Sequence, residues 1–77
     1  METIDKVKAI LAEQLDYAVE DIRDSSDVMG DLGADSLDIV DVVMAIEEEF
    51  DIEVPDEDVP LLKSVGEIAT YVDNKKA

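Results

Sequence analysis

The sequence contains no cysteine and no histidine among its 77 residues. Without cysteine the chain can form no disulfide and no thiolate metal site, and it offers no cysteine nucleophile. Without histidine it lacks the usual general base near neutral pH, so a serine nucleophile would need activation by a carboxylate or a lysine. These two absences argue against an enzyme with a catalytic centre of its own.

Basic residues are also scarce, since 6 Lys and Arg face 22 Asp and Glu and leave a net charge of −16. Such a charge repels phosphate backbones and anionic membrane surfaces. No apolar run approaches the roughly 20 residues that span a bilayer, and the first residues do not resemble a signal peptide. We therefore expect a soluble, cytoplasmic protein that binds no nucleic acid and does not associate stably with a membrane.

Hydrophobic residues nevertheless make up 47% of the chain, which is enough for a core and argues against general disorder. A chain of 77 residues has room for one small domain, and a second independent core would not fit. We expect a single domain over residues 1–77 and a monomer.

Residues 3–15 have the spacing of an amphipathic helix. Residues 16–34 are rich in Asp, Ser and Gly, with isolated apolar residues among them. A loop of that length in a compact domain is usually functional or disordered, and the embedded apolar residues favour an ordered loop. The apolar residues of the helix are Ile4, Val7, Ile10, Leu11 and Leu15, and those of the loop include Ile22, Val28 and Leu32.

A second helix is predicted from the residues after Asp35 to about Phe50. Asp35 is a suitable N-cap, because a carboxylate accepts hydrogen bonds from the free N–H groups of the first turn. Asp38 stands at the capping-box position, where Glu or Gln is the more usual residue.

Two shorter segments complete the chain. A third helix is expected to begin after Pro55, but Pro60 lies inside it and removes a backbone donor, so we expect one or two distorted turns. Ser64 and Glu67 form a capping-box pattern that begins the last helix. The sequence therefore predicts an all-α four-helix bundle with three longer helices, a short distorted third helix and a long ordered loop between the first two.

The predicted second helix has an unusual second face. Placed on a helical wheel, six apolar residues fill the arc that we assign to the core, whereas Leu37 and Met44 lie among carboxylates on the other arc. Glu47 projects at the edge of the core arc and is expected to reach solvent. The core arc holds Ile39, Val40, Val42, Val43, Ile46 and Phe50, and the acidic arc holds Asp38, Asp41, Glu48 and Glu49.

Two interpretations of this second face remain open. It is either a solvated surface with two stray apolar residues, which is common in proteins, or a docking strip. In a docking strip the carboxylates steer a basic partner while Leu37 and Met44 provide apolar anchors.

Ser36 follows Asp35 directly, at the predicted start of this helix. Unpaired N–H groups and the positive end of the helix dipole favour an anionic group there, so a phosphate ester on the Ser36 oxygen would be stabilised even though Asp35 and Asp38 oppose it. The alternative is structural: Ser36 itself caps the helix, as a serine at such a boundary usually does.

The motif around Ser36 resembles a known one. Residues 31–38, Asp-Leu-Gly-Ala-Asp-Ser-Leu-Asp, closely resemble the attachment motif of acyl carrier proteins. The stretches 43–51 and 55–57 are also similar to that family, and the likeness covers nearly the whole chain with the same order of four helices.

The resemblance implies a carrier with no catalytic activity of its own. In that family the serine that matches Ser36 is modified by a phosphopantetheinyl transferase with coenzyme A, and the 4'-phosphopantetheine arm ends in a thiol that holds acyl groups as thioesters. The reactive sulfur then belongs to the cofactor rather than to the protein. The implied partners are the transferase and fatty acid synthesis enzymes with basic surfaces.

The resemblance also implies two sets of site residues. The first set contacts partner enzymes, and the second lines the space between the helices that an acyl chain can enter. The implied contact residues are Asp35, Leu37, Asp38, Asp41, Met44, Glu47 and Glu48, and the implied cavity residues are Val40, Ile46, Leu62, Ile68 and Tyr71.

Several positions depart from the family's usual pattern and leave the length of the cargo open. Ile39 stands where a threonine is common, and Val59-Pro60-Leu61 replaces a more polar segment without proline. A carrier for another thioester pathway, with a polyketide, an aminoacyl group or a specialised fatty acid as cargo, remains an alternative. So does an acidic interaction protein without a prosthetic group.

A calcium sensor of the EF-hand type is excluded. That loop requires a glycine at its sixth position and a glutamate at its twelfth. Counted from Asp31 these positions hold Ser36 and Val42, and counted from Asp27 they hold Leu32 and Asp38.

The net charge of −16 generates a first prediction. Self-repulsion in so small a body destabilises the folded state, and salt screens it over about 8–10 Å at ordinary ionic strength. We expect modest NaCl or MgCl₂ to raise the melting temperature near neutral pH, measured by circular dichroism. A melting temperature that responds to neither salt would contradict this account of the repulsion.

Overall fold

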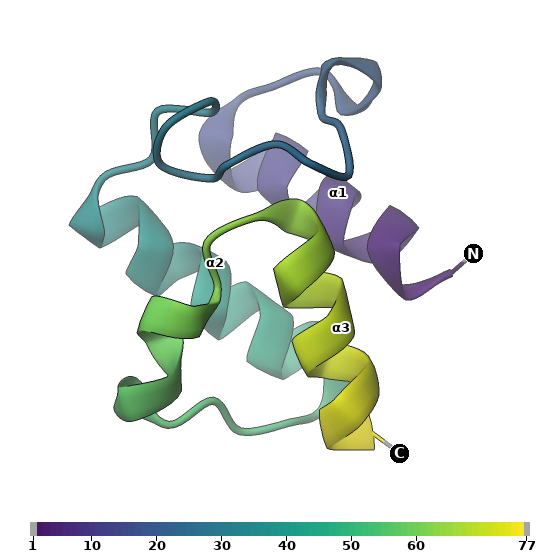
Figure 1. Cartoon of the computed structure of the whole chain (residues 1–77), viewed down its shortest axis with the longest axis vertical. Helices are drawn as coiled ribbons and strands as arrows, with labels where there is room; N and C mark the ends of the chain where they lie inside the picture. Colours follow the sequence, from purple (N-terminus) through teal and green to yellow (C-terminus); the bar gives the residue numbers. More distant parts are fainter. Residues whose placement is uncertain (1, 77) are drawn as a thin grey trace.

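The computed structural model describes residues 2–76. In this part of the chain three α-helices and two 3-10 helices form the fold, and α3 lies in front of α1 and α2 in Figure 1. The helices are α1 (Thr3–Leu15), η1 (Val19–Asp21), α2 (Ser36–Phe50), η2 (Asp56–Leu61) and α3 (Val65–Lys76). The all-α fold with a short third segment and a long connection after α1 is therefore confirmed.

Each α-helix turns one apolar stripe toward a shared core. Leu11 of α1, Ile46 of α2 and Ile68 of α3 are almost completely buried. Burying a side chain of this kind contributes about 1.5–3 kcal/mol relative to leaving it in water. The other buried residues of these stripes are Val7 and Ala12 of α1, Val42, Val43 and Phe50 of α2, and Val65, Ala69 and Val72 of α3.

The core-face prediction was wrong at Val40, because 53% of its surface is exposed. At the α-helical repeat Val40 lies about 40° from Met44 and about 60° from Leu37. Both neighbours are also exposed, at 60% and 75%. Val40 therefore belongs to the outer surface of α2 rather than to its core face.

The η2 segment is a 3-10 helix of six residues with Pro60 inside it, in agreement with the predicted distortion. None of its residues is buried, although Val59 packs partly against the core. Leu62, which follows directly, is buried. The apolar contacts of this segment with the core are therefore limited to Val59 and to Leu62 directly after it.

Several of the few cations lie against aromatic rings. Lys6 and Lys76 stand 5.9 Å and 5.7 Å from the centre of the Phe50 ring, and Lys75 stands 5.7 Å from that of Tyr71. Lys8 forms an ion pair with Asp24 at 2.5 Å. Phe50 is the last residue of α2, so the two lysines connect the start of α1 and the end of α3 to the end of α2.

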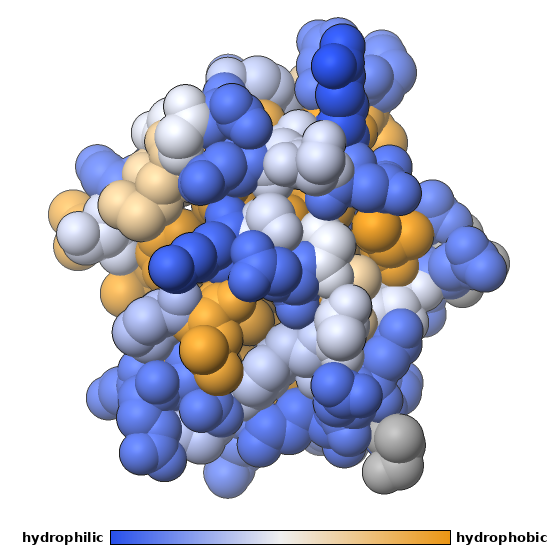
Figure 2. Space-filling model, viewed as in Figure 1, coloured by the Kyte–Doolittle hydropathy of each residue, from blue (hydrophilic) through white to orange (hydrophobic). Residues whose placement is uncertain are grey.

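The surface is mostly hydrophilic on the face that Figure 2 shows, with hydrophobic atoms exposed in a few separate places. Among residues 2–76, no helix has the length and apolar character needed to cross a membrane.

Candidate functional site

The first turn of α2 is held by two aspartates that cap each other. The Asp35 carboxylate accepts a hydrogen bond from the backbone N–H of Asp38 at 2.9 Å, and the Asp38 carboxylate accepts one from the N–H of Asp35 at 3.2 Å. Asp35 is thus the N-cap, and the predicted capping box is confirmed. Ser36 is the first helical residue and is exposed, so the interpretation that Ser36 caps the helix was wrong.

The loop before Ser36 is folded by a second pair of aspartates. The Asp27 carboxylate accepts hydrogen bonds from the N–H groups of Met29 and Gly30, both at 3.0 Å, and the Asp31 carboxylate accepts one from the N–H of Asp27 at 2.8 Å. Gly33 then takes a left-handed conformation with φ of 72°, which a residue with a side chain rarely adopts. These bonds set the direction in which the chain enters α2.

Backbone hydrogen bonds attach this loop to the start of α3. The N–H of Val28 donates to the Lys63 carbonyl at 2.8 Å, and the N–H of Gly66 donates to the Asp24 carbonyl at 2.9 Å. A Cβ atom on Gly66 would lie only 3.2 Å from that carbonyl oxygen, so a side chain there would push this backbone contact apart by a few tenths of an ångström. The loop is further fixed by the buried side chains of Val28, Leu32 and Ala34.

An exposed apolar stripe continues from Ser36 along α2. Leu37, Val40 and Met44 follow one another at helical spacing, and all three are more than half exposed. Asp41 and Glu48 are exposed on the same helix. The structure thus brings together the predicted anchors Leu37 and Met44 with exposed carboxylates, and it adds Val40, which the wheel placed in the core.

The remaining acidic residues predicted to contact partners differ in exposure. Asp35 is exposed, whereas Asp38 and Glu47 are partly buried. The Glu47 carboxylate accepts a hydrogen bond from the N–H of Val54 at 2.8 Å, so it fixes the chain that follows α2. Within residues 2–76 no three acidic side chains converge on a site for a metal ion.

An apolar cleft of about 450 Å³ opens between the loop, α2 and η2. Ile39, one turn after Ser36, lies on its α2 side, and Val59 and Leu62 lie on its other side. The cleft is completed by Asp27, Met29, Gly30, Pro60 and Lys63. Its lining is suited to an aliphatic group.

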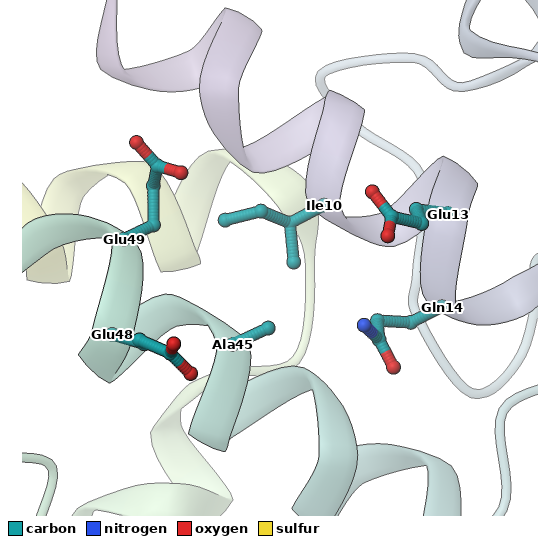
Figure 3. A pocket seen from close by; sticks show the side chains of 6 residues that line it. All are labelled: Ile10, Glu13, Gln14, Ala45, Glu48 and Glu49. Atoms are coloured by element: carbon teal, nitrogen blue, oxygen red, sulfur yellow. The ribbon is translucent and has the colours of Figure 1, made fainter.

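A different hollow, of about 410 Å³, lies between α1 and α2. Figure 3 shows Ile10 and Ala45 facing its interior, with Glu13 and Gln14 of α1 and Glu48 and Glu49 of α2 around them. Carboxylates and an amide make this space unsuited to an alkyl chain, because burying them without partners is costly. The apolar cleft beside η2 is therefore the better place for such a chain.

The predicted cavity residues do not all reach one space. Leu62 lines the apolar cleft, Val40 lines a smaller hollow of about 220 Å³ between α2 and η2, and Tyr71 lines a groove between η2 and α3. Ile46 and Ile68 are buried in the core. Sequence reasoning named Ile39 and Val59 only as departures that bear on the length of the cargo, and it missed Met29, for which apolar character in the loop before Ser36 was the only signal.

Tyr71 connects α3 to η2, because its hydroxyl donates a hydrogen bond to the Asp58 carboxylate at 2.7 Å. Partial burial, this hydrogen bond and the negative charges of Asp58 and Glu47 raise the pKa of Tyr71 to about 12. The hydroxyl therefore remains a protonated donor throughout the physiological range of pH.

Comparison with known proteins agrees with this arrangement. The sequence profile of the family described as "Phosphopantetheine attachment site" matches residues 5–72. The chain is 45% identical over 76 residues to an acyl carrier protein of Campylobacter jejuni subsp. doylei, with 99% of each chain covered. The chain belongs to the acyl carrier protein family.

Two further acyl carrier proteins show similar agreement. That of Bdellovibrio bacteriovorus is 51% identical over 70 residues, covering 91% of this chain and 90% of the relative. That of Clostridium acetobutylicum is 52% identical over 68 residues, covering 88% of each. As a member of the acyl carrier protein family, the chain is a non-catalytic carrier of fatty acid synthesis with an attachment site for phosphopantetheine.

The capping pair generates a second prediction. Asp35→Ala should lower the free energy of unfolding by about 0.5–2 kcal/mol, because the N–H of Asp38 loses its acceptor. Urea denaturation followed by circular dichroism measures this change. Asp41→Ala is the matched control, since it removes the same charge from the same helix without removing the cap. Equal stabilities of the two variants would contradict the capping role.

Proposed function

We propose that Ser36 is the attachment residue for 4'-phosphopantetheine. The observation that carries this proposal is the exposed Ser36 hydroxyl at the first position of α2, a helix of 15 residues. The family finding supplies the chemistry, since a profile named for the attachment site spans this position.

The start of α2 fits an anionic phosphodiester. In the described residues no hydrogen bond uses the N–H groups of Ser36 and Leu37, whereas those of Asp38 and Ile39 are bonded to Asp35. Free N–H groups and the helix dipole favour a negative charge at this position. The carboxylates of Asp35 and Asp38 oppose it, but each already accepts a backbone hydrogen bond.

The arm, when bound, supplies the thiol that forms thioesters, and the protein supplies shelter for the cargo. We propose that an acyl chain enters the bundle through the apolar cleft beside Ile39, between α2 and η2. Of the predicted set, Leu62 lines this cleft, whereas Val40, Ile46, Ile68 and Tyr71 would contact only a chain that extends beyond it. Removing an aliphatic chain from water is favourable by about 0.8 kcal/mol per buried methylene.

The outer surface of α2 is proposed to dock partner enzymes. Carboxylates of Asp35, Asp41 and Glu48 are exposed to solvent and would steer a basic surface, and Leu37 and Met44 would be desolvated on contact. Asp38 and Glu47 would add charge from partly buried positions. The proposed partners are a phosphopantetheinyl transferase and basic-surfaced fatty acid synthesis enzymes in the cytoplasm, which the chain meets as a monomer.

A specialised acyl group is the second candidate for the cargo. It is favoured by Val59 and Pro60, which line the cleft, because larger side chains at these positions leave less room for cargo than smaller ones would. The attachment chemistry on Ser36 is the same in both cases.

Loading of the arm tests the attachment residue. Incubation with coenzyme A and a broad-specificity phosphopantetheinyl transferase should add the mass of one phosphopantetheinyl group, measured on the intact protein. Ser36→Ala should abolish this gain, and Ser25→Ala, which removes another exposed hydroxyl, should leave it unchanged. No gain in the wild type, or an undiminished gain in Ser36→Ala, would refute the carrier proposal.

Charge reversal tests the docking surface. Asp41→Lys or Glu48→Lys should slow association with a basic partner enzyme by tenfold or more at low salt, because steering is lost, while helicity stays nearly unchanged. Stopped-flow kinetics measure the rate. Glu20→Lys makes the same change of charge on η1 and is the control. If all three variants slow association equally, net charge rather than the α2 surface is responsible.

A further inference from the structure

Hollows surround η2 on three sides. The apolar cleft of about 450 Å³ separates it from the loop before Ser36, a hollow of about 220 Å³ separates it from α2, and a groove of about 510 Å³ separates its end from α3. Val59 lines both of the first two spaces. The η2 segment is therefore a thin wall between two partly apolar spaces.

On both sides of η2 a main-chain group of the neighbouring residues forms a hydrogen bond with the rest of the bundle. Before η2, the N–H of Val54 donates to the Glu47 carboxylate at 2.8 Å. After η2, the Lys63 carbonyl accepts from the N–H of Val28 at 2.8 Å. Val54 and Leu62 are buried, but none of the residues 55–61 between them is buried.

The middle of the wall is held by a polar side-chain contact. Asp58 lies in η2, and its carboxylate accepts the hydrogen bond from the Tyr71 hydroxyl of α3 at 2.7 Å. A hydrogen bond to a charged group is among the stronger ones in proteins. Partly buried Val59 adds only a limited apolar contact, and Pro60 removes one backbone donor from the segment.

We propose that the Tyr71–Asp58 hydrogen bond is a latch that holds η2 closed and thereby limits the length of acyl chain that the bundle can shelter. Moving η2 outward joins the cleft at Ile39 to the hollow at Val40 and Val43, since Val59 is the residue that divides them. The joined space extends along α2 toward Val54 and is also bordered by Glu47, whose carboxylate is already bonded to the N–H of Val54, and by the exposed Asp56. This inference rests on the proposed function, because it concerns the cargo held on Ser36.

The latch is tested first on the protein without its arm, by amide hydrogen exchange. Tyr71→Phe keeps the ring and its contact with Lys75 but removes the donor, and Asp58→Ala removes the acceptor. Each variant should raise exchange at the amides of η2 by roughly tenfold, the factor expected from losing one charge-assisted hydrogen bond, and the double variant should raise it no further.

Two controls separate this effect from general loosening. Tyr17→Phe removes the hydroxyl of the other tyrosine, which is more exposed and forms no hydrogen bond through that hydroxyl in the described residues. The core amides of Val7 and Leu11 in α1 report global opening. Unchanged exchange in η2 of Tyr71→Phe, or an equal rise in α1, overturns the latch.

The cargo limit is tested on the loaded protein. Saturated acyl groups of increasing length are attached through the arm, and the rate of thioester cleavage by hydroxylamine is measured for each length. The thioester should remain protected from hydroxylamine with longer acyl chains in Tyr71→Phe than in the wild type or in Tyr17→Phe. The same dependence on length in all three overturns the inference about cargo, whereas failure to load Ser36 at all would refute the proposed function and leave the exchange result standing.

Discussion

The site depends on how one helix begins. Asp35 and Asp38 satisfy each other's backbone N–H groups, and this leaves Ser36 as the first helical residue with its side chain in solvent. If Ser36 were the N-cap, its hydroxyl oxygen would accept a hydrogen bond from the first turn of the helix and would be less available for attachment of a prosthetic group. The Asp27 and Asp31 pair upstream fixes the direction of the chain into the same turn.

The same helix supplies both the core and the surface that meets partners. Val42 and Ile46 are buried in the shared core, whereas Leu37, Val40 and Met44 are exposed to solvent. Because the same 15 residues serve both purposes, the effect of a substitution in α2 depends on whether the residue lies on the inner or the outer face of the helix. Changes on the inner face act on stability, and changes on the outer face act on recognition.

Much of the fold follows from local patterns in the sequence. The helical period predicts α1 and α2, Asp35 predicts the start of α2, and Pro60 predicts the irregular η2. Each of these is decided by residues within a few positions of one another, where backbone geometry and capping dominate. The resemblance to acyl carrier proteins identified Ser36, and neither charge nor periodicity alone would have done so.

The details that escaped prediction are set by the approach of distant segments. Val40 shares a hollow with Val59 of η2, and the role of Glu47 depends on the position of Val54 after the helix has ended. The cleft at Ile39 is bordered by the loop and by Lys63, which hydrogen bonds hold together across a long separation in the sequence. A helical wheel contains none of these neighbours, so it cannot distinguish a buried valine from one at the edge of a cleft.

The lysines that stack on aromatic rings have an electrical consequence. Lys6 and Lys76 lie over Phe50, Lys75 lies over Tyr71, and Lys8 is paired with Asp24, so four of the 6 cations already have a partner other than Asp41. Two of these lysines are held at the ring of Phe50, the last residue of α2, whereas Asp41 on the outer side of the helix is exposed. The outer side of α2, which carries Asp41 and the exposed Ser36, therefore attracts a cationic surface without competition from these lysines.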